Sequence, residues 1–258
     1  MTALVTGASS GIGLMFAREL ARQGHDVVLV SNQAVELLKT AEDLHSEFGV
    51  ATYVVYKDLS TPTAAQELHD FCVEYQLAID ILINDAGVFF FNYLHNVPVE
   101  KIEQMLLLHV LNTTRMTRMF GEDMQKRGKG YILNMSSLAG LVSMPGIQCY
   151  SASKAYIDNF SRSVWYELHP YGVNVLSVTP GAVDTGLYGL SSPLRKLALR
   201  LHVSITPEQL VRKALKALFA GKKRCMPGLI NHLSLPFIKH CPDRLIHATI
   251  KRIDKFMK

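Results

Sequence analysis

Three polar side chains in the second half of the chain have types and spacing that suit proton transfer at a carbonyl oxygen. Tyr150 and Lys154 are four residues apart, so on a helix they lie one turn apart on the same face. Ser137 lies thirteen residues before Tyr150, after a short apolar segment, 131–135, that is typical of a strand. A tyrosine and a lysine at this spacing also occur by chance on solvated helices. The cofactor signals elsewhere in the chain therefore decide whether the pair is functional.

A glycine-rich segment at the start of the chain predicts a binding site for a dinucleotide. The apolar residues 3–5 are followed by the letters TGASSGIG and then by a helical pattern over 14–23. Gly7, Gly11 and Gly13 permit a close backbone approach that a side chain would block, and a helix N-terminus offers free N–H groups to a pyrophosphate. Glycine-rich loops alone are weak signals, but a strand before the loop and a helix after it favour this interpretation.

The end of the second predicted strand, 26–30, bears on the choice of cofactor. An acidic residue at that point would accept a hydrogen bond from the ribose 2′-hydroxyl of NAD, whereas an arginine would favour the 2′-phosphate of NADP. This chain has Ser31, Asn32 and Gln33 there, so it offers neither. Because no carboxylate repels a 2′-phosphate, we expect NADP(H) to be preferred over NAD(H).

Strand and helix patterns alternate along the whole chain. Further strands are predicted at 51–56, 78–83, 131–135, 173–178 and shortly after 226, with helices at 35–48, 62–75, 98–126, 150–169, 206–220 and after 242. This alternation predicts an α/β fold: a single-domain, Rossmann-type, doubly wound parallel sheet of about seven strands, with helices on both faces. We expect this domain to take up residues 1–258, with 186–258 as a substrate loop and a basic C-terminal extension.

Composition and charge narrow the class of protein. Of the 258 residues, 48% are hydrophobic and 19% charged, as in ordinary globular chains. No apolar run approaches the roughly 18 residues that span a bilayer, and Met1 leads straight into an apolar strand, so we expect a cytoplasmic protein. The four cysteines and ten histidines show no metal-ligand spacing, which predicts reduced thiols and no metal site.

The charges are unevenly distributed. Residues 193–258 hold 15 lysines and arginines against 3 acidic residues, whereas residues 1–192 hold 12 against 19. A basic segment of this kind could contact an anionic substrate or an anionic membrane surface, or it could be the solvated face of amphipathic helices. We favour the solvated face, and we expect no nucleic-acid partner.

Together these motifs resemble the short-chain dehydrogenase/reductase family over roughly residues 2–226. The region after 206 is similar to a subgroup with DltE-like oxidoreductases and hydroxysteroid and 3-ketoacyl reductases. The resemblance implies that Ser137, Tyr150 and Lys154 are catalytic. It implies a cofactor site made of Gly7, Ser9, Ser10, Gly11, Ile12, Gly13, Ser31, Asn32, Asp58, Leu59, Asn84, Ala86, Gly87, Tyr150, Lys154, Pro180, Gly181, Val183 and Thr185.

Two residues depart from the family's pattern. Asp85 replaces the second asparagine of the N-N-A-G element, which keeps the turn and changes the local charge. His109 occupies the position of the family's fourth catalytic residue, an asparagine. His109 could relay a proton or be a buried polar residue. Alternatively Asn112, one turn later, or a backbone carbonyl with a water, could take over the asparagine's role.

The reaction implied by the resemblance is hydride transfer between a nicotinamide and a carbonyl or secondary alcohol. Tyr150 would give or accept the proton, Lys154 would lower the pKa of the phenol, and Ser137 would hold the substrate oxygen. An alternative is a dinucleotide-binding regulatory protein with little or no catalysis, which the departure at 109 leaves open.

The substrate is expected to be lipophilic, such as a steroid or a fatty-acyl ketone. Ser137, Phe89, Phe90 and Tyr188 are the candidate substrate contacts, because aromatic residues surround the predicted site. The aromatic run 89–91 could instead pack in the core. The long helices predicted at 98–126 and 150–169 could also pack against a second subunit, so we expect a homodimer or homotetramer.

Overall fold

The computed structural model describes residues 1–184 and 204–228, together with residues 235 and 242. Its centre is a seven-stranded sheet, all of whose pairings are parallel, with the order β3-β2-β1-β4-β5-β6-β9. The strands are β1 (Thr2–Thr6), β2 (Asp26–Ser31), β3 (Thr52–Tyr56), β4 (Ile79–Asn84), β5 (Gly130–Met135), β6 (Val173–Val178) and β9 (Arg224–Cys225). A separate pair is formed by β7 (Ala182–Val183) and β8 (Ser204–Ile205). Because the strand order reverses beside β1 and β4, this point is where such sheets bind ligands.

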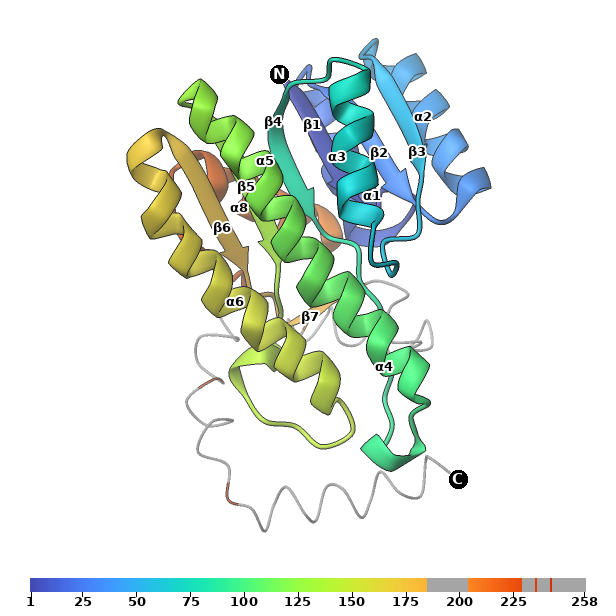
Figure 1. Cartoon of the computed structure of the whole chain (residues 1–258), viewed down its shortest axis with the longest axis vertical. Coiled ribbons are helices and arrows are strands. Elements are labelled where there is room, and N and C mark those ends of the chain that lie inside the picture. Colours follow the sequence, from blue (N-terminus) through green and yellow to red (C-terminus); the bar gives the residue numbers. More distant parts are fainter. Residues whose placement is uncertain (185–203, 229–234, 236–241, 243–258) are drawn as a thin grey trace.

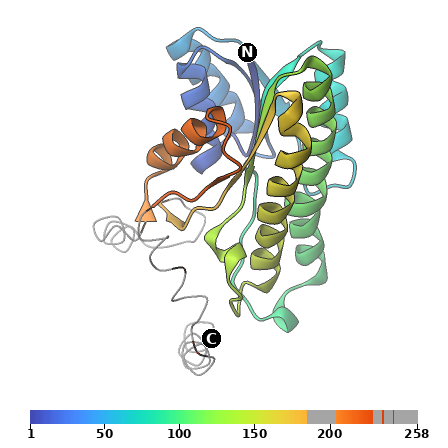
Figure 2. The same cartoon turned by 90° about the vertical axis from the view of Figure 1, so that its left-hand side faces the viewer.

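Helices cover both faces of the sheet (Figures 1 and 2). One face carries α1 (Gly11–Arg22), α2 (Ala34–Phe48) and α8 (Pro207–Phe219). The other carries α3 (Ala64–Glu74), α4 (Val99–Leu106), α5 (Thr113–Arg127) and α6 (Gln148–Leu168). The predicted doubly wound fold is confirmed.

Each face of the sheet buries its own hydrophobic core. Because successive side chains of a strand point to opposite faces, Ala3 and Val5 pack on the α1 side, whereas Leu4 packs on the α3 side. Both sides are buried, so the strands are apolar nearly throughout rather than alternating. The buried polar residues of the strands lie at or next to their carboxyl ends: Thr6, Ser31, Asn84, Asn134 and Ser177.

Some predicted boundaries shift. α1 begins at Gly11, three residues earlier than its apolar pattern indicated, so the end of the glycine-rich loop is the first turn of the helix. The predicted helix after Thr206 is confirmed, and the Thr206 side chain accepts a hydrogen bond from the Gln209 N–H as its N-cap. α8 and β9 belong to the expected extension 186–258, whereas the helix expected after Pro242 lies outside the described residues.

The helix predicted over 98–126 is present, but its central segment is not α-helical. Between α4 and α5 the chain forms a π-helical segment, Leu107–Asn112, and the helix continues through it without a break in direction (Figure 1). A π turn holds one extra residue, a difference that a 3.6-residue apolar pattern does not reveal. The segment buries both His109 and Asn112. Within the described residues, no helix is both long enough and apolar enough to cross a membrane.

Candidate active site

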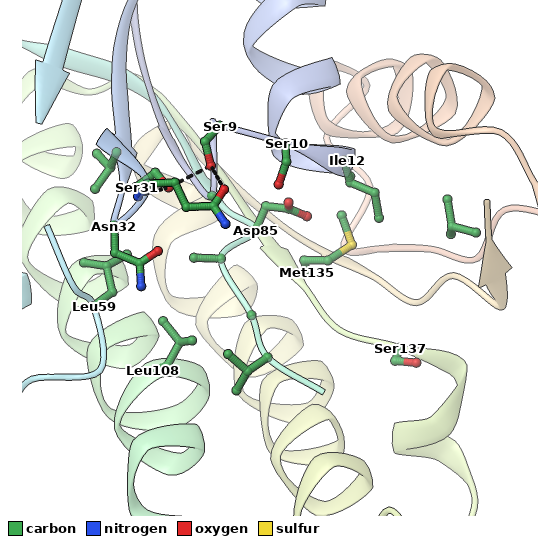
Figure 3. Close-up of a pocket in the computed structure, with 18 of the residues that line it drawn as sticks. Ser9, Ser10, Ile12, Ser31, Asn32, Leu59, Asp85, Leu108, Met135 and Ser137 are labelled. Carbon is green, nitrogen blue, oxygen red and sulfur yellow. Dashed lines mark hydrogen bonds between the residues drawn. The ribbon is translucent and has the colours of Figure 1, made fainter. Parts of the chain in front are cut away.

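A pocket of about 460 Å³ opens at the carboxyl ends of the strands. Most of the predicted cofactor and catalytic residues line it: Gly7, Ser9, Ser10, Gly11, Ile12, Ser31, Asn32, Asp58, Leu59, Ala86, Gly87, Ser137, Tyr150, Lys154, Pro180, Gly181 and Val183. Figure 3 shows Ser31, Asn32 and Leu59 at one end of the pocket, Ser137 toward the other, and Asp85 between them. Residues from several separate segments between Gly7 and Val183 thus meet in one elongated site.

Two predicted cofactor residues do not line the pocket, and a third cannot be placed. A Cβ on Gly13 would lie 2.2 Å from the Gly7 carbonyl oxygen, so Gly13 allows α1 to approach the loop. The Asn84 side chain is buried and donates to Asn134 Oδ1 at 2.7 Å, which ties β4 to β5. Thr185 lies outside the described residues.

The glycine-rich loop is fastened to the loop after β4. Thr6 Oγ1 accepts hydrogen bonds from the backbone N–H groups of Asp85 and Ala86, both at 3.0 Å. Gly7 has a φ of +70°, and a Cβ there would lie 3.1 Å from the Ala86 Cα. Only glycine permits both this conformation and this contact without strain. The two loops therefore form one continuous wall of the pocket.

Several pocket residues were not among the predicted cofactor, catalytic or substrate contacts: Val30, Gln33, Lys57, Asp85, Val88, Leu108, Met135 and Ser136. Gln33 Oε1 accepts from the Ser9 hydroxyl at 2.9 Å. Lys57 follows β3 directly, and its Nζ lies 2.6 Å from Glu67 Oε2. The signal that could have found both is their position, because ligands bind beyond the carboxyl ends of strands.

Tyr150 and Lys154 lie in the first two turns of α6 and are each 5% exposed. Lys154 Nζ donates to the Met135 carbonyl at 2.8 Å and lies 5.7 Å from the centre of the Tyr150 ring. The Ser136 hydroxyl donates to the Lys154 carbonyl at 2.6 Å. These two bonds in opposite directions fix this part of α6 against the end of β5.

Ser137 follows β5 and caps the short 3₁₀ helix η3 (Leu138–Leu141). Its Oγ accepts from the Ala139 N–H at 3.2 Å, which orients the side chain at the pocket wall. A hydroxyl that accepts one hydrogen bond can still donate its own proton. The arrangement can therefore offer Ser137 as a donor to an oxygen in the pocket, beside a phenol and an ammonium.

The residues considered for the family's asparagine role differ in position. His109 is 1% exposed, and its ring centre lies 5.8 Å from that of Tyr150, behind the pocket wall. Asn112 Nδ2 donates to the carbonyls of Leu59 and Thr61, at 2.8 and 2.7 Å. The Asn112 side chain therefore anchors the loop after β3, and it does not line the pocket.

Two aromatic residues of the run after β4 pack against a small hydrophobic cluster. Phe89 contacts Tyr150 edge to face, with ring centres 5.1 Å apart, and Phe90 packs in the same small cluster with Met105 and Ile147. Neither Phe89 nor Phe90 lines the described pocket, and both are half-buried against this cluster. The third candidate aromatic contact, Tyr188, lies outside the described residues.

Opposite charges share the interior of the pocket. Burial raises the pKa of Asp85 to about 7, and the Lys154 ammonium partly offsets this rise. Burial likewise lowers the pKa of Lys154 to about 8, and the Asp85 carboxylate opposes that change. Asp85 therefore helps Lys154 to keep its proton in a place that disfavours the charge.

Replacing Asp85 by asparagine should move the alkaline limb of the pH–activity profile to lower pH, because Lys154 would lose its proton more readily. The wild-type carboxyl has a folded pKa of about 7 against 3.8, so wild-type stability falls as pH rises through this interval. The stability of D85N should not fall with pH in this interval. Profiles of kcat/KM and urea unfolding from about pH 4 to 9 measure both effects. An unmoved alkaline limb in D85N would show that Asp85 does not support the lysine.

The comparisons with known proteins identify the family. A family model described as short chain dehydrogenase matches residues 1–193. The chain belongs to the short-chain dehydrogenase family. It is 35% identical over 217 residues to a duck (Anas platyrhynchos) very-long-chain 3-oxoacyl-CoA reductase, covering 83% of this chain and 67% of that protein. It is 30% identical over 253 residues to mouse (Mus musculus) 17-beta-hydroxysteroid dehydrogenase type 3, covering 96% and 78%.

Solved structures agree with this membership. A short-chain dehydrogenase from Sphingobium yanoikuyae, determined in complex with NADPH, has a TM-score of 0.80 and 30% identity, covering 98% of this chain and 95% of that one. A 7beta-hydroxysteroid dehydrogenase has a TM-score of 0.86 and 27% identity, covering 96% and 95%. As a short-chain dehydrogenase, the protein is an oxidoreductase that acts on CH–OH or C=O groups with a nicotinamide dinucleotide. The expected reaction class is confirmed, and the regulatory alternative gains no support.

Proposed function

We propose that the protein reduces a lipophilic ketone, or oxidises the corresponding secondary alcohol, with NADP(H), and that the substrate is of the fatty-acyl or steroid class. The observation that carries the proposal is the meeting of Ser137, Tyr150 and Lys154 at one end of a pocket that begins at the glycine-rich loop. The names of the duck and mouse relatives support the substrate class.

The residues present fit the cofactor that this reaction needs. The first turn of α1 follows the glycine-rich loop, and its free N–H groups suit a pyrophosphate. Asp58 and Leu59 line the far end of the pocket, where the resemblance implies the adenine, while Pro180 and Gly181 line the wall expected to hold the nicotinamide amide. When bound, the nicotinamide would supply or accept the hydride of this reaction.

The chain's own catalytic residues hold the substrate oxygen and move its proton. Ser137 donates a hydrogen bond to the carbonyl oxygen and holds it beside Tyr150. In reduction the Tyr150 phenol donates its proton to that oxygen, and in oxidation the phenolate removes the proton from the alcohol. The Lys154 ammonium stabilises the phenolate, and burial of both side chains excludes water from the transfer.

The preference for NADP(H) is proposed from the end of the pocket beside β2. Ser31, Asn32 and Gln33 contribute no carboxylate there, and Lys57 contributes an ammonium. The Lys57 N–H donates to the Ser31 carbonyl at 2.9 Å, so these strand ends are neighbours. A ribose 2′-phosphate would therefore meet no carboxylate on residues 31–33, and the Lys57 ammonium, which pairs with Glu67, lies at the neighbouring strand end.

Replacing Lys57 by glutamine should weaken NADPH binding about tenfold and leave NADH binding within about twofold, because only NADPH carries the 2′-phosphate. Fluorescence titration of both cofactors against wild type and K57Q measures this. K126Q is the matched control, since Lys126 also pairs with a glutamate but lies on the exposed surface of α5. Equal weakening of both cofactors in K57Q, or tighter binding of NADH by the wild type, would contradict the proposal.

The function itself is tested by NADPH oxidation with a panel of ketones. The panel should contain 3-oxoacyl thioesters of increasing chain length, keto-steroids, and small polar ketones as negative controls. We expect kcat/KM to rise with apolar size. Turnover confined to the polar ketones would reject the substrate class, whereas cofactor binding without turnover of any ketone would favour the regulatory alternative.

Location and assembly are further parts of the proposal. We expect a cytoplasmic homodimer or homotetramer, with the basic residues of 193–258 facing solvent. Light scattering of the purified protein measures the assembly. Sedimentation with anionic liposomes at low salt tests the membrane-surface alternative, and binding there would reject the solvated role of the basic segment.

A further inference from the structure

His109 connects two walls of the site through both of its ring nitrogens. Nε2 accepts a hydrogen bond from the backbone N–H of Val88 at 3.0 Å, in the loop after β4 that lines the pocket. Nδ1 lies 3.0 Å from the hydroxyl of Ser153 on α6. The Ser153 hydroxyl in turn lies 2.8 Å from the carbonyl of Tyr150 and donates to it.

Only one arrangement of protons satisfies this chain of bonds. Because the Val88 N–H can only donate, Nε2 must accept and carries no proton. The proton of the neutral ring is then on Nδ1 and is donated to Ser153, whose own proton is committed to the Tyr150 carbonyl. Burial lowers the pKa of His109 well below its usual range, and the Lys154 ammonium lowers it further. The charged group that acts on His109 is Lys154 on α6, and the Tyr150 ring lies 5.8 Å away.

We propose that His109 is a positioning residue: a neutral, two-armed bridge that sets the separation between the cofactor-lining loop at 86–88 and the first turn of α6. This inference rests on the proposed function, because it concerns the placing of Tyr150 against the bound cofactor. His109 holds a single proton throughout the reaction and passes none to Lys154 or Tyr150. A positioning histidine thus stands where the family has a catalytic asparagine.

The surrounding backbone is built to hold an imidazole. The π-helical segment Leu107–Asn112 presents His109 at the interior without ending the long helix. Gly87 leaves room for the ring, since a Cβ there would lie 3.1 Å from Nε2. An asparagine at 109 is shorter than histidine and would reach only one of the two partners. The bridge therefore depends on the length of the ring.

Two substitutions separate the arms of the bridge. Glutamine places its terminal amide near the position of Nε2, so H109Q keeps the bond to Val88 and loses the bond to Ser153. Asparagine places its amide near Nδ1, so H109N keeps the bond to Ser153 and loses the bond to Val88. We expect H109N to raise the dissociation constant and KM of NADPH about tenfold, and H109Q to lower kcat about tenfold.

A double-mutant cycle identifies the second arm. Ser153→Ala should lower kcat by about the same factor as H109Q, and the pair H109Q/S153A should be no slower than either single variant. His69→Gln is the matched control. His69 also bonds through Nε2, to Asp123 on α5, but it lies away from the pocket, so H69Q should leave both kinetic constants unchanged.

Three results would overturn the inference. A pH–rate profile that loses one limb in both H109Q and H109N would make His109 a relay. Lower melting temperatures in both variants, with kcat and KM of the folded protein unchanged, would make it merely structural. In ¹⁵N-histidine NMR, assigned with H109Q, a protonated Nε2 or a titration between about pH 5.5 and 8.5 would contradict the assigned tautomer.

Failure of the proposed function is distinguishable from failure of this inference. NADPH dissociation constants and the histidine NMR spectrum need no substrate. If no ketone is turned over, weaker NADPH binding by H109N but not by H109Q still supports the bridge. If ketones are turned over and the two variants behave alike, the bridge is rejected and the function stands.

Discussion

Replacing Tyr150 by phenylalanine should lower kcat for ketone reduction by about 10²- to 10⁴-fold, the range that a positioned acid or base contributes. The substitution removes only the phenolic oxygen. The ring still packs edge to face on Phe89 and beside His109, so the fold and the pocket wall are preserved. NADPH binding should change by no more than about threefold, because a single hydrogen bond to the cofactor is lost.

Tyr156→Phe is the matched control for Tyr150→Phe. Tyr156 lies on the same helix, is exposed, and bonds to Thr114 rather than facing the pocket. The kcat of the Tyr156→Phe variant should equal that of the wild type. Initial rates with saturating NADPH measure both variants. If Y150F retains more than about a tenth of the wild-type kcat, the proton comes from another group and the proposed role of Tyr150 is wrong.

Replacing Lys154 by methionine should nearly abolish activity without weakening the fold. An ammonium about 4 Å from a phenolate, at an effective dielectric constant near 20, favours the ionised phenol by up to about 4 kcal/mol, or roughly 3 pK units. Loss of this attraction between ammonium and phenolate should raise the apparent pKa for alcohol oxidation by up to roughly 3 units. At neutral pH the rate of oxidation should fall by as much as about 10³-fold.

The stability of Lys154→Met carries an independent prediction. The folded pKa of about 8 lies below the ordinary 10.5, so at neutral pH the wild type bears the full cost of burying the charge. Between these values the folded state has lost the proton that the unfolded state retains, and wild-type stability rises with pH. The variant should therefore be at least as stable near pH 7, and its advantage should shrink from about pH 8 to 10.5.

Urea unfolding of wild type and K154M across this pH interval measures the change. Both proteins should unfold with the same denaturant dependence, which shows that the folded states expose similar surface. A variant that is several kcal/mol less stable at neutral pH would mean that the hydrogen bond from Lys154 to Met135 outweighs the cost of burial. That outcome would give the lysine a mainly structural role.

The fold could be predicted from the sequence because its signals are local. β1, which contains Val5, and β2, which contains Leu29, are buried on both faces. Each is therefore a short apolar run, and a turn and a helix follow it in the sequence. The same rule located most of the pocket, since parallel strands deliver their carboxyl ends to one edge. Thr206 illustrates the local kind of signal at a helix start, where a single side chain caps the helix that follows.

The parts that the sequence did not predict depend on tertiary contacts. Asn84 belongs to the family motif, yet its side chain turns to Asn134 in the next strand, and only the register of β4 with β5 reveals this. The extra residue of the π turn has no apolar signature. Lys57 and Gln33 carry no motif, and they reach the pocket because β2 and β3 end side by side.

The paired hydrogen bonds between the end of β5 and Lys154 fix the lysine without any contribution from the loops at 91–93 and 142–146. These two loops are joined to each other by a backbone bond from Asn92 to Gly146. A designer seeking a new substrate would therefore randomise residues 91–93 and 142–146 together, and leave Phe89, which packs against Tyr150, unchanged.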